Sequence, residues 1–440
     1  MKMDPATPTG GAPSDDESYP RGRQVVITLG LLCLVSAMLT MDVSLVGLLI
    51  EPVKHDLRLT DGQLGILQGP ASSLAYAAFA IPMGILVDRL NRVKMVLLAT
   101  FFWTAAIFVM AYSDSFWVFV AAKILIGIVM AVLLTAPFTI IADLLPPRGR
   151  AGGVTYLVIG QYLGGALGFL VGGLVFDWFT RSAVTTGLPL LGDLSPWRAS
   201  FVVFGALGVL LLPFLLLMRE PERKERRVQR PDLRAQLKEL HAYRGFLWPI
   251  YLGYALQVIT DSSIRAWLSP ALMRLYDLTP GQFGGWVGAT VLLGGITGSA
   301  MGGWFAEQSR RRDGTMIVVV ITCVVLAASS CLALMPTVTG LVALFVVGTL
   351  ANGVLATMVS AMLITYVPNE LRGLSSGILI LVAVGPGLAI GPVLVPAVSS
   401  ALGGPMQLGL AMALVGVPAA LLSAVAYGFA RTGARADRPA

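Results

Sequence analysis

Residues 84–92 read GILVDRLNR, and residues 303–311 read GWFAEQSRR. In each stretch a glycine, an acid and an arginine follow one another at steps of four residues: Gly84, Asp88 and Arg92, then Gly303, Glu307 and Arg311. An apolar run of about twenty residues, long enough to cross a membrane, ends before each acid, and basic residues follow it. A chain that repeats the end of a membrane span halfway along has two homologous halves, an architecture typical of transporters.

Composition excludes a soluble globular protein. Charged residues make up 12% of the chain and apolar residues 56%, against about 25% and 45–50% in globular domains. Because the mean hydropathy is +0.79, most of the chain must face lipid or another buried helix. The basic residues behind the net charge of +7 lie between the apolar runs, so this charge does not indicate a nucleic-acid partner.

The apolar runs predict twelve transmembrane helices in two sets of six. The first set lies near residues 25–49, 63–87, 94–112, 117–142, 151–176 and 198–218. The second set lies near residues 246–268, 283–306, 315–335, 339–366, 372–398 and 405–429. We therefore expect an all-α integral membrane protein built from two pseudosymmetric six-helix bundles, at 25–218 and 246–430.

Three segments lie outside the bundles. Residues 1–24 are expected to form a disordered tail, and residues 431–440 a second tail. Residues 219–245 form a basic linker, in which Leu233, Leu237 and Leu240 share one helical face. This pattern fits either an amphipathic helix on the membrane surface or a solvated tether.

Lys and Arg residues gather on one side of the predicted spans. Of the 31, 24 lie on the side of the termini, and four lie in the opposite loops: Lys54, Arg58, Arg181 and Arg274. The positive-inside rule therefore predicts that both termini are cytoplasmic. We recognise no cleavable signal or organelle address, which favours the cell membrane (plasma or inner membrane) of a prokaryote.

The repeat extends beyond the loop motif. Matching positions in the two halves are Pro146 and Pro368, Arg150 and Arg372, and Gly168 and Gly391. With these features the chain resembles the major facilitator superfamily along essentially all its length, and within it is most similar to the spinster-like transporters. The residues that carry the second resemblance are Asp42, Glu51-Pro52, Pro82 through Arg92, Asp143, Arg150-Ala151, Trp197-Arg198 and Phe201. The resemblance implies a cavity lined by spans one and seven, and amphipathic or lipid-like substrates.

Two departures from the spinster-like pattern bear on mechanism. Val43 follows Asp42, where these proteins usually carry arginine. Met130 stands where their span-four glutamate is found. Because that glutamate is thought to help proton coupling in the family, its full proton mechanism cannot be carried over.

Four charged residues inside the spans are candidates for substrate binding or proton coupling, since a charge at that depth costs about 2.5–3.5 kcal/mol. Asp42 and Asp261 are pseudosymmetric mates, and in one cavity they would titrate as a coupled pair. Alternatively, Asp261 is neutralised by Arg265 four residues on, and Asp42 by Lys123. Lys123 is equally a candidate ligand for an anionic substrate. Four further polar residues would line the cavity or form interhelical hydrogen bonds: Gln68, Gln161, Gln257 and Asn352.

The loop motifs predict a cytoplasmic gate, and the alternative is simple positive-inside anchoring. Asp88 would bind an arginine or a helix N-terminus of the neighbouring span. Arg89 and Arg92 would pair with acids such as Asp143, and these contacts would exist only while the cytoplasmic side is closed. The predicted gate comprises Gly84, Asp88, Arg89, Arg92, Asp143, Arg150, Gly303, Glu307 and Arg311.

The sequence has no zinc-ligand spacing, phosphate loop or catalytic triad, so we expect no metal site, cofactor or enzymatic activity. We expect a secondary active transporter that moves a small organic solute by alternating access, coupled to protons and acting as a monomer in the lipid bilayer. The alternatives are an uncoupled facilitator and, in a different class, a membrane sensor or scaffold that has lost transport.

Overall fold

The computed structural model describes residues 19–20, 22–182, 194–223, 233–310 and 314–436. Within this part of the chain every regular element is a helix, as predicted. The N-terminal half contains α1 (Arg23–Leu57), α2 (Asp61–Gln68), α3 (Pro70–Arg89), α4 (Arg92–Ala111), α5 (Phe116–Leu133), α6 (Ala136–Leu144), α7 (Arg150–Arg181) and α8 (Pro196–Leu215).

A short linker helix, α9 (Leu233–Ala242), precedes the C-terminal half. That half contains α10 (Arg244–Tyr276), α11 (Pro280–Arg310), α12 (Thr315–Ser329), η3 (Leu332–Leu334), α13 (Val338–Tyr366), α14 (Asn369–Val382), η4 (Ala383–Gly387), α15 (Leu388–Ala401), η5 (Pro405–Gln407) and α16 (Leu408–Ala436). Each predicted apolar run coincides with one helix or with consecutive helical segments.

Two of the predicted runs are interrupted where glycine or proline weakens the helix. Gly69 separates α2 from α3, and Pro70, which has no backbone N–H, begins the second segment. In the C-terminal half, the π-helical turn η4 contains Pro386 and separates α14 from α15 within the run predicted at 372–398. These two broken spans lie against each other, because α2 packs on α15 and α3 on η4.

Ten helical spans in the described residues are long and apolar enough to cross a membrane. The other two predicted spans correspond to α10 and α11, which have 33 and 31 residues and would each be more than 45 Å long at about 1.5 Å per residue. Their apolar character is diluted by glycines and, in α10, by Gln257, Asp261 and Arg265. Length therefore permits twelve spans, although composition alone identifies ten.

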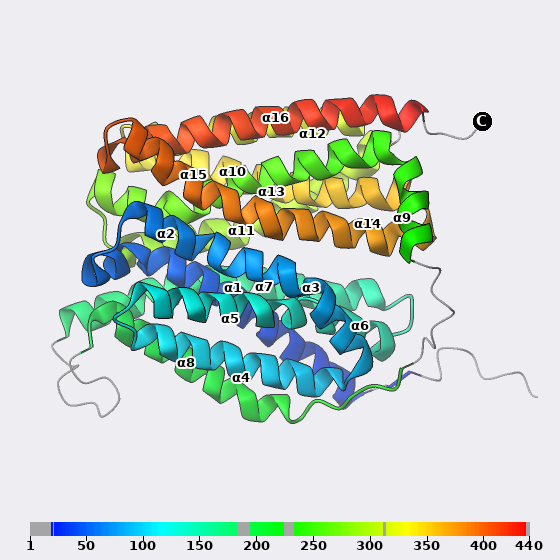
Figure 1. The fold of residues 1–440 in the computed structure, drawn as a ribbon, viewed down its shortest axis with the longest axis horizontal. Helices are drawn as coiled ribbons and strands as arrows, with labels where there is room; N and C mark the ends of the chain where they lie inside the picture. Colours follow the sequence, from blue (N-terminus) through cyan, green and yellow to red (C-terminus); the bar gives the residue numbers. More distant parts are fainter. Residues whose placement is uncertain (1–18, 21, 183–193, 224–232, 311–313, 437–440) are drawn as a thin grey trace, which may run out of the picture.

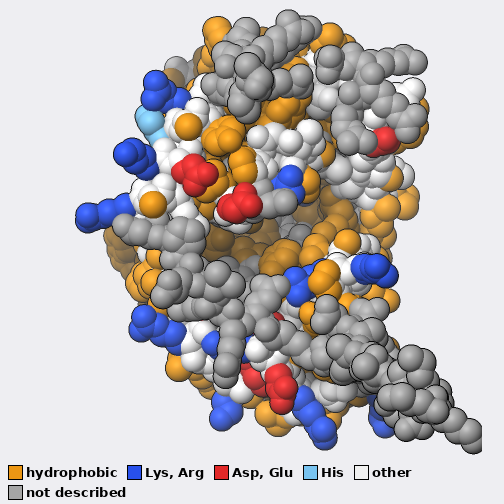
Figure 2. All heavy atoms as spheres, turned by 90° about the vertical axis from the view of Figure 1, so that its right-hand side faces the viewer, with side chains coloured by type: hydrophobic (Ala, Val, Ile, Leu, Met, Phe, Trp, Pro, Cys, Tyr) orange, Lys and Arg blue, Asp and Glu red, His pale blue; other side chains and the backbone are white. Residues whose placement is uncertain are grey.

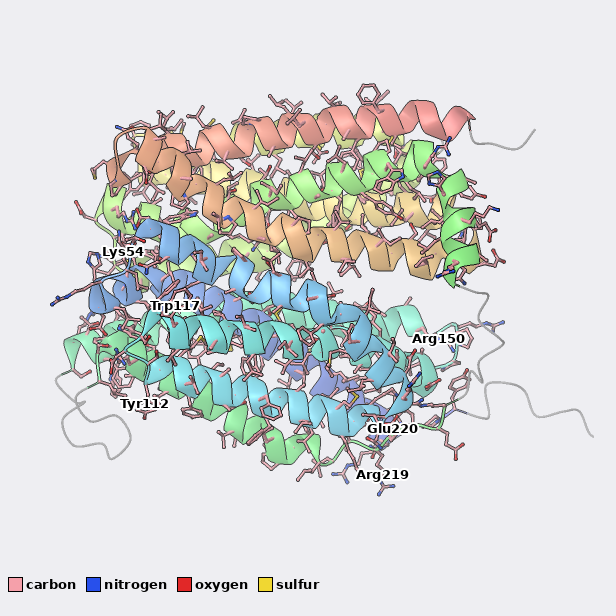
Figure 3. The ribbon with its side chains drawn as sticks, in the orientation of Figure 1. Lys54, Tyr112, Trp117, Arg150, Arg219 and Glu220 are labelled. Carbon is pink, nitrogen blue, oxygen red and sulfur yellow. The ribbon has the colours of Figure 1, made fainter. Side chains whose placement is uncertain are left out.

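The helices run roughly side by side between two ends of the molecule (Figure 1). The start of α1, the linker helix α9 and the end of α16 lie at one end, which we call the terminal end. We call the opposite end the far end. Figure 3 shows Arg150, Arg219 and Glu220 at the terminal end, and Lys54 at the far end.

The buried apolar core differs between the two ends. At the far end one continuous core contains residues of both halves, such as Leu48 and Leu49 of α1 with Trp267 and Leu268 of α10. At the terminal end the C-terminal half has a separate core, which includes Phe246 and Ile250. Among the described residues, the core that spans both halves thus includes the far end, whereas the core around Phe246 and Ile250 belongs to the C-terminal half alone.

Candidate functional site

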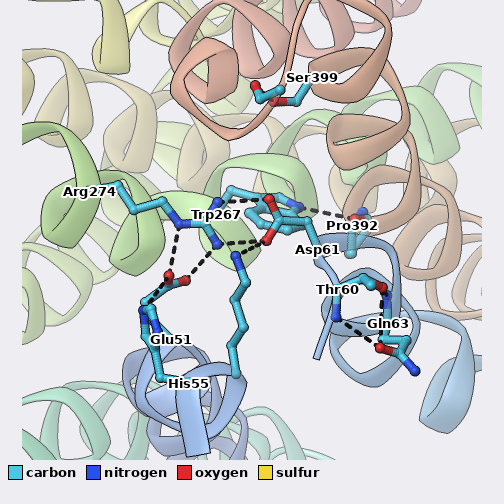
Figure 4. Close-up of polar contacts among 11 residues, drawn as sticks. Glu51, His55, Thr60, Asp61, Gln63, Trp267, Arg274, Pro392 and Ser399 are labelled. Atoms are coloured by element: carbon cyan, nitrogen blue, oxygen red, sulfur yellow. Dashed lines mark hydrogen bonds and ion pairs between the residues drawn. The ribbon is translucent and has the colours of Figure 1, made fainter. Parts of the chain in front are cut away.

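The far end is closed by a cluster of charged residues from both halves, which we call the far-end latch: Glu51, Lys54, Asp61 and Arg274 (Figure 4). Arg274, near the end of α10, donates to both oxygens of Glu51 on α1, at 2.9 and 2.7 Å. It also donates to both oxygens of Asp61 at the start of α2, at 2.8 Å each. Lys54 Nζ lies 2.6 Å from Asp61. One guanidinium thus joins two segments of the opposite half.

Close backbone packing reinforces the latch. Ser269 Oγ donates to the backbone oxygen of Leu48 across the halves, at 2.7 Å, and Trp267 donates to the backbone oxygen of Pro392 within the C-terminal half. A Cβ atom added to Gly65 of α2 would lie 2.5 Å from the backbone oxygen of Pro392 in α15. Only glycine permits this approach between the halves, so the far end is sealed by backbone as well as by charge.

The terminal end has the opposite character. Figure 2, which views the molecule from this end, shows a hollow between the halves with hydrophobic side chains in its walls. We call this hollow the central recess. It lies where the cores of the two halves are separate, and the structure therefore combines a closed far end with an open terminal end.

Asp42 is buried rather than exposed to the recess. It lies in α1 and is 2% exposed. Lys123 Nζ of α5 lies 3.6 Å from its Oδ2, and both carboxylate oxygens lack a hydrogen-bond partner among the described residues. In this state the pair has the geometry of the structural bridge that the sequence left as an alternative.

Asp261 and Arg265 are more accessible. Arg265 Nε donates to Asp261 Oδ2 at 2.7 Å, and the two side chains are 40% and 22% exposed respectively. Along α10, Tyr254, Val258, Asp261 and Arg265 are partly exposed, while most residues between them are buried. Tyr162 of α7 lies close enough to act electrostatically on Arg265 and on Tyr254. This stripe of α10 therefore faces the other half.

The four polar candidates fall in different places. Gln257 is buried, donates to Asn352 at 3.0 Å and accepts from Tyr427 at 3.1 Å, so it forms an interhelical network within the C-terminal half. Gln68 is partly buried, and its Nε2 has no hydrogen-bond partner among the described residues. The backbone oxygen of Gln161 accepts from Thr40 of α1 at 2.8 Å.

The first loop motif packs within the N-terminal half. Arg92, at the start of α4, pairs with Asp143 of α6 and with Glu220, whose Oε1 is 2.7 Å from Arg92 Nε. Glu220 also accepts from the backbone N–H of Val93 at 2.9 Å. All the partners of Arg92 in this structure belong to its own half or to the start of the linker, so these contacts do not join the two halves.

The same neighbourhood anchors the first residues of the linker. Arg223 donates to the backbone oxygens of Val87, Asp88 and Leu90 at the end of α3. Positive charge at a helix C-terminus is favourable, because the free carbonyl groups there carry partial negative charge. Residues 219–223 are therefore held against the N-terminal half, and among the described residues of the linker the predicted helix corresponds to α9.

The remaining gate candidates are symmetric between the halves. Arg150 donates to the backbone oxygen of Leu145, and its mate Arg372 donates to that of Val367, each five residues earlier. A Cβ atom added to Gly84 or to Gly303 would meet nothing within 4 Å. Arg89 lies at the end of α3 and Glu307 in the last turn of α11. Arg311 lies outside the described residues.

Sequence reasoning missed the far-end latch. Arg274 was only one of four basic residues on the outer side, and Glu51 only a point of family resemblance. The feature of the sequence that could have revealed the latch is the small number of charged residues on that side. An arginine and a few acids in apolar surroundings need one another as partners. The anchoring of Glu220 and Arg223 had no such signal in a linker rich in alternating charges.

A family model described as Major Facilitator Superfamily matches residues 32–392. The chain is similar to an MFS-type efflux pump of Mycolicibacterium smegmatis, with 25% identity over 431 residues, 94% of each protein. It is also similar to protein spinster homolog 1 of Xenopus tropicalis, with 26% identity over 327 residues, which cover 67% of this chain and 57% of that protein.

Among solved structures, the fold is similar to that of a bacterial homologue of the human lysosomal transporter spinster, described as inward-facing and occupied. The two share 21% sequence identity with a TM-score of 0.78, and the match covers 96% of this chain and 100% of the other. This likeness extends over both helical halves.

Proposed function

The chain belongs to the Major Facilitator Superfamily of membrane transporters, and we propose that it moves a small organic solute across the cell membrane by alternating access. The observation that carries this proposal is the asymmetry between the ends. At the far end one guanidinium joins the halves, and at the terminal end a recess separates them (Figure 2). Rocking of the halves would break the contacts of the guanidinium at the far end and close the recess at the terminal end.

The terminal end is proposed to face the cytoplasm, with all twelve predicted spans crossing the membrane. The concentration of Lys and Arg in the loops of that side supports this orientation. In this orientation the recess receives solute from, or releases it to, the cytoplasm. Gly84 and Gly303, which have open space around them in this state, would contact neighbouring helices when the terminal end closes.

Proton coupling is proposed to use the two pseudosymmetric acids. Each has a basic partner, and the side chains of Asp261 and Arg265 are partly exposed whereas those of Asp42 and Lys123 are buried. A proton entering from the terminal end would therefore reach Asp261 first, and Asp42 would become available only when its contact with Lys123 opens. A charge near the membrane interior is costly without a partner. Protonation of either acid is therefore linked to a change of partner by its lysine or arginine.

The alternative is an uncoupled facilitator. Met130 takes the place of the acid expected in span four, and the Asp42–Lys123 pair is buried. Both observations favour a structural role for Asp42 and a solute that moves down its own gradient.

The test is flux in proteoliposomes loaded with candidate organic solutes, including carboxylates, amines and neutral amphiphiles. Wild-type protein should exchange at least one labelled solute across the bilayer, and a pH gradient should drive its accumulation. Asp261→Asn and Asp42→Asn should retain exchange between equal solute concentrations but lose the pH-driven part. Accumulation that persists unchanged in both variants would reject the coupling assignment, and exchange no faster than in empty liposomes would reject transport.

A further inference from the structure

We propose that Arg265 is the binding point for an oxyanion group, a carboxylate or a phosphate monoester, on the transported solute. This inference rests on the proposed transport function and assigns the chemical class of its substrate. It begins from the position of Arg265 on the accessible stripe of α10, where its side chain is 40% exposed.

Asp261 orients the guanidinium of Arg265 but occupies only one of its N–H groups. Arg265 Nε is held by Asp261 Oδ2 at 2.7 Å, and the described residues supply no hydrogen-bond partner to its two terminal amino groups. Guanidinium presents N–H groups along more than one edge in a fixed plane. The edge formed by the terminal amino groups is therefore available to both oxygens of a carboxylate or phosphate.

The surroundings of Arg265 are rich in hydrogen-bond donors. Tyr162 of α7 and Tyr254 of α10 contribute hydroxyl groups near the Asp261–Arg265 pair. The Tyr162 hydroxyl also lies 2.9 Å from Ser299 Oγ of α11, which fixes it at the boundary between the halves. A carboxylate or a doubly ionised phosphate accepts hydrogen bonds and donates none, so it suits the open N–H edge of Arg265 and can also accept from the neighbouring hydroxyl groups.

Gln68 adds an independent observation. A Cβ atom added to Gly47 would lie 3.9 Å both from Gln68 Oε1 and from the backbone oxygen of Arg265, so the two residues flank the same turn of α1. Gln68 Nε2 is buried and has no partner among the described residues. A buried donor without an acceptor is unfavourable, and an acceptor brought to this level of the recess would satisfy it once the halves move.

Lys123, the other basic candidate for an anion ligand, is placed differently. Its side chain is 6% exposed and its ammonium lies 3.6 Å from Asp42. An anion in the recess would have to displace Asp42 to reach it. Arg265 needs no displacement, since its own acid occupies only the Nε edge.

The apolar walls of the recess indicate the rest of the solute. Figure 2 shows hydrophobic side chains around the hollow, and Val258 lies on the same stripe of α10 as Arg265. We expect an anionic head at Arg265 and an apolar body against these walls, because burying apolar surface contributes about 25 cal/mol per Å².

The test uses matched probes whose carbon skeleton is constant and whose head group changes. The purified full chain is titrated with octanoate, octyl phosphate, octanamide and octylamine below their micelle-forming concentrations, and binding is read from the thermal unfolding midpoint. Octanoate or octyl phosphate should stabilise the wild type more than the amide or the amine does. Arg265→Gln should weaken anion binding about 10- to 100-fold, the effect of losing a charge-assisted bidentate contact.

Two further variants separate binding from misfolding. Arg265→Lys keeps the charge and should retain part of the affinity, although it cannot bind two oxygens in one plane. Arg181→Gln is the matched control, because Arg181 also pairs with an acid four residues away, Asp177, but its side chain is 79% exposed at the far end. It should bind the anions as the wild type does.

Anions that stabilise the wild type no better than the amide or the amine would overturn the proposal, and so would anion binding unchanged in Arg265→Gln. Solute exchange in proteoliposomes keeps this result separate from the proposed function. If an amine or a neutral solute is exchanged, transport stands and the anion assignment falls. If anions bind through Arg265 but no solute is exchanged, the anion site stands and transport falls.

Discussion

Removing the guanidinium of the far-end latch should open the far end. In Arg274→Gln, Glu51 and Asp61 lose their shared partner, and their side chains are only 4% and 11% exposed. Leaving one member of a buried ion pair without its partner costs about 3–5 kcal/mol. Lys54 still lies 2.6 Å from Asp61 and offsets part of the loss, so we take the lower value, about 3 kcal/mol.

That free energy changes the ratio of closed to open far ends about 100-fold, since 1.4 kcal/mol corresponds to a factor of ten. A population that is about 99% closed would become about half open. The assay is the distance distribution between spin labels at Gly62→Cys and Ala401→Cys, exposed positions on α2 and α15, in a background without the three native cysteines. Wild type should give one short distance, and Arg274→Gln a second, longer one.

Two comparisons make the result interpretable. Arg181→Gln, a far-end arginine that pairs within its own helix, should leave the distribution unchanged. Adding Glu51→Gln to Arg274→Gln should recover part of the short distance, because the cost arises from the unpaired carboxylate rather than from the missing contact alone. An Arg274→Gln distribution identical to that of the wild type would refute the reasoning.

Three other perturbations follow from the packing. Gly164→Ala should lower the free energy of unfolding by about 1–3 kcal/mol, because the added Cβ would collide with the backbone of Ala37 in α1. Gly152→Ala is the control and should not lower it, since the added Cβ meets nothing within 4 Å. Thermal unfolding compares the two variants. Glu220→Ala should weaken the hold of Arg92 on the start of the linker, leaving its hydrogen bond to the backbone oxygen of Pro221, and should speed cleavage of the linker in limited proteolysis. An unchanged cleavage rate would count against the anchoring. Asp42→Asn should destabilise the fold by leaving the Lys123 ammonium buried, and further replacement of that lysine by methionine should restore the unfolding midpoint if the pair is a structural bridge.

Much of the fold was predictable because a membrane imposes long apolar runs. The runs gave the helices and their division into halves, and the repeat of Gly84-Asp88-Arg92 gave the pseudosymmetry. The resemblance to the superfamily and to the spinster-like proteins is confirmed by the family match and by the relatives. The break at Gly69 was missed, because a span that is interrupted but still apolar has the same sequence pattern as a continuous one.

The site was less predictable, because the sequence does not show which state the halves adopt. The spacing of Asp261 and Arg265 predicted their contact, since positions four apart meet on a helix. The pairing of Asp42 with Lys123 was one of two alternatives, and only packing between α1 and α5 distinguishes them. Arg274 joins residues more than 200 positions away, so its role depends on how the halves pack.

The central claim is that closure alternates between the two ends, and two distances in the same preparation test it. One spin-label pair spans the far end at Gly62 and Ala401, and the other spans the terminal end at Gly152 of α7 and Gln308 of α11, both exposed. In liposomes, any condition that lengthens the far-end distance, including Arg274→Gln, should shorten the terminal-end distance by a matching population. A far end that opens while the terminal-end distance stays fixed would contradict alternating access in this chain.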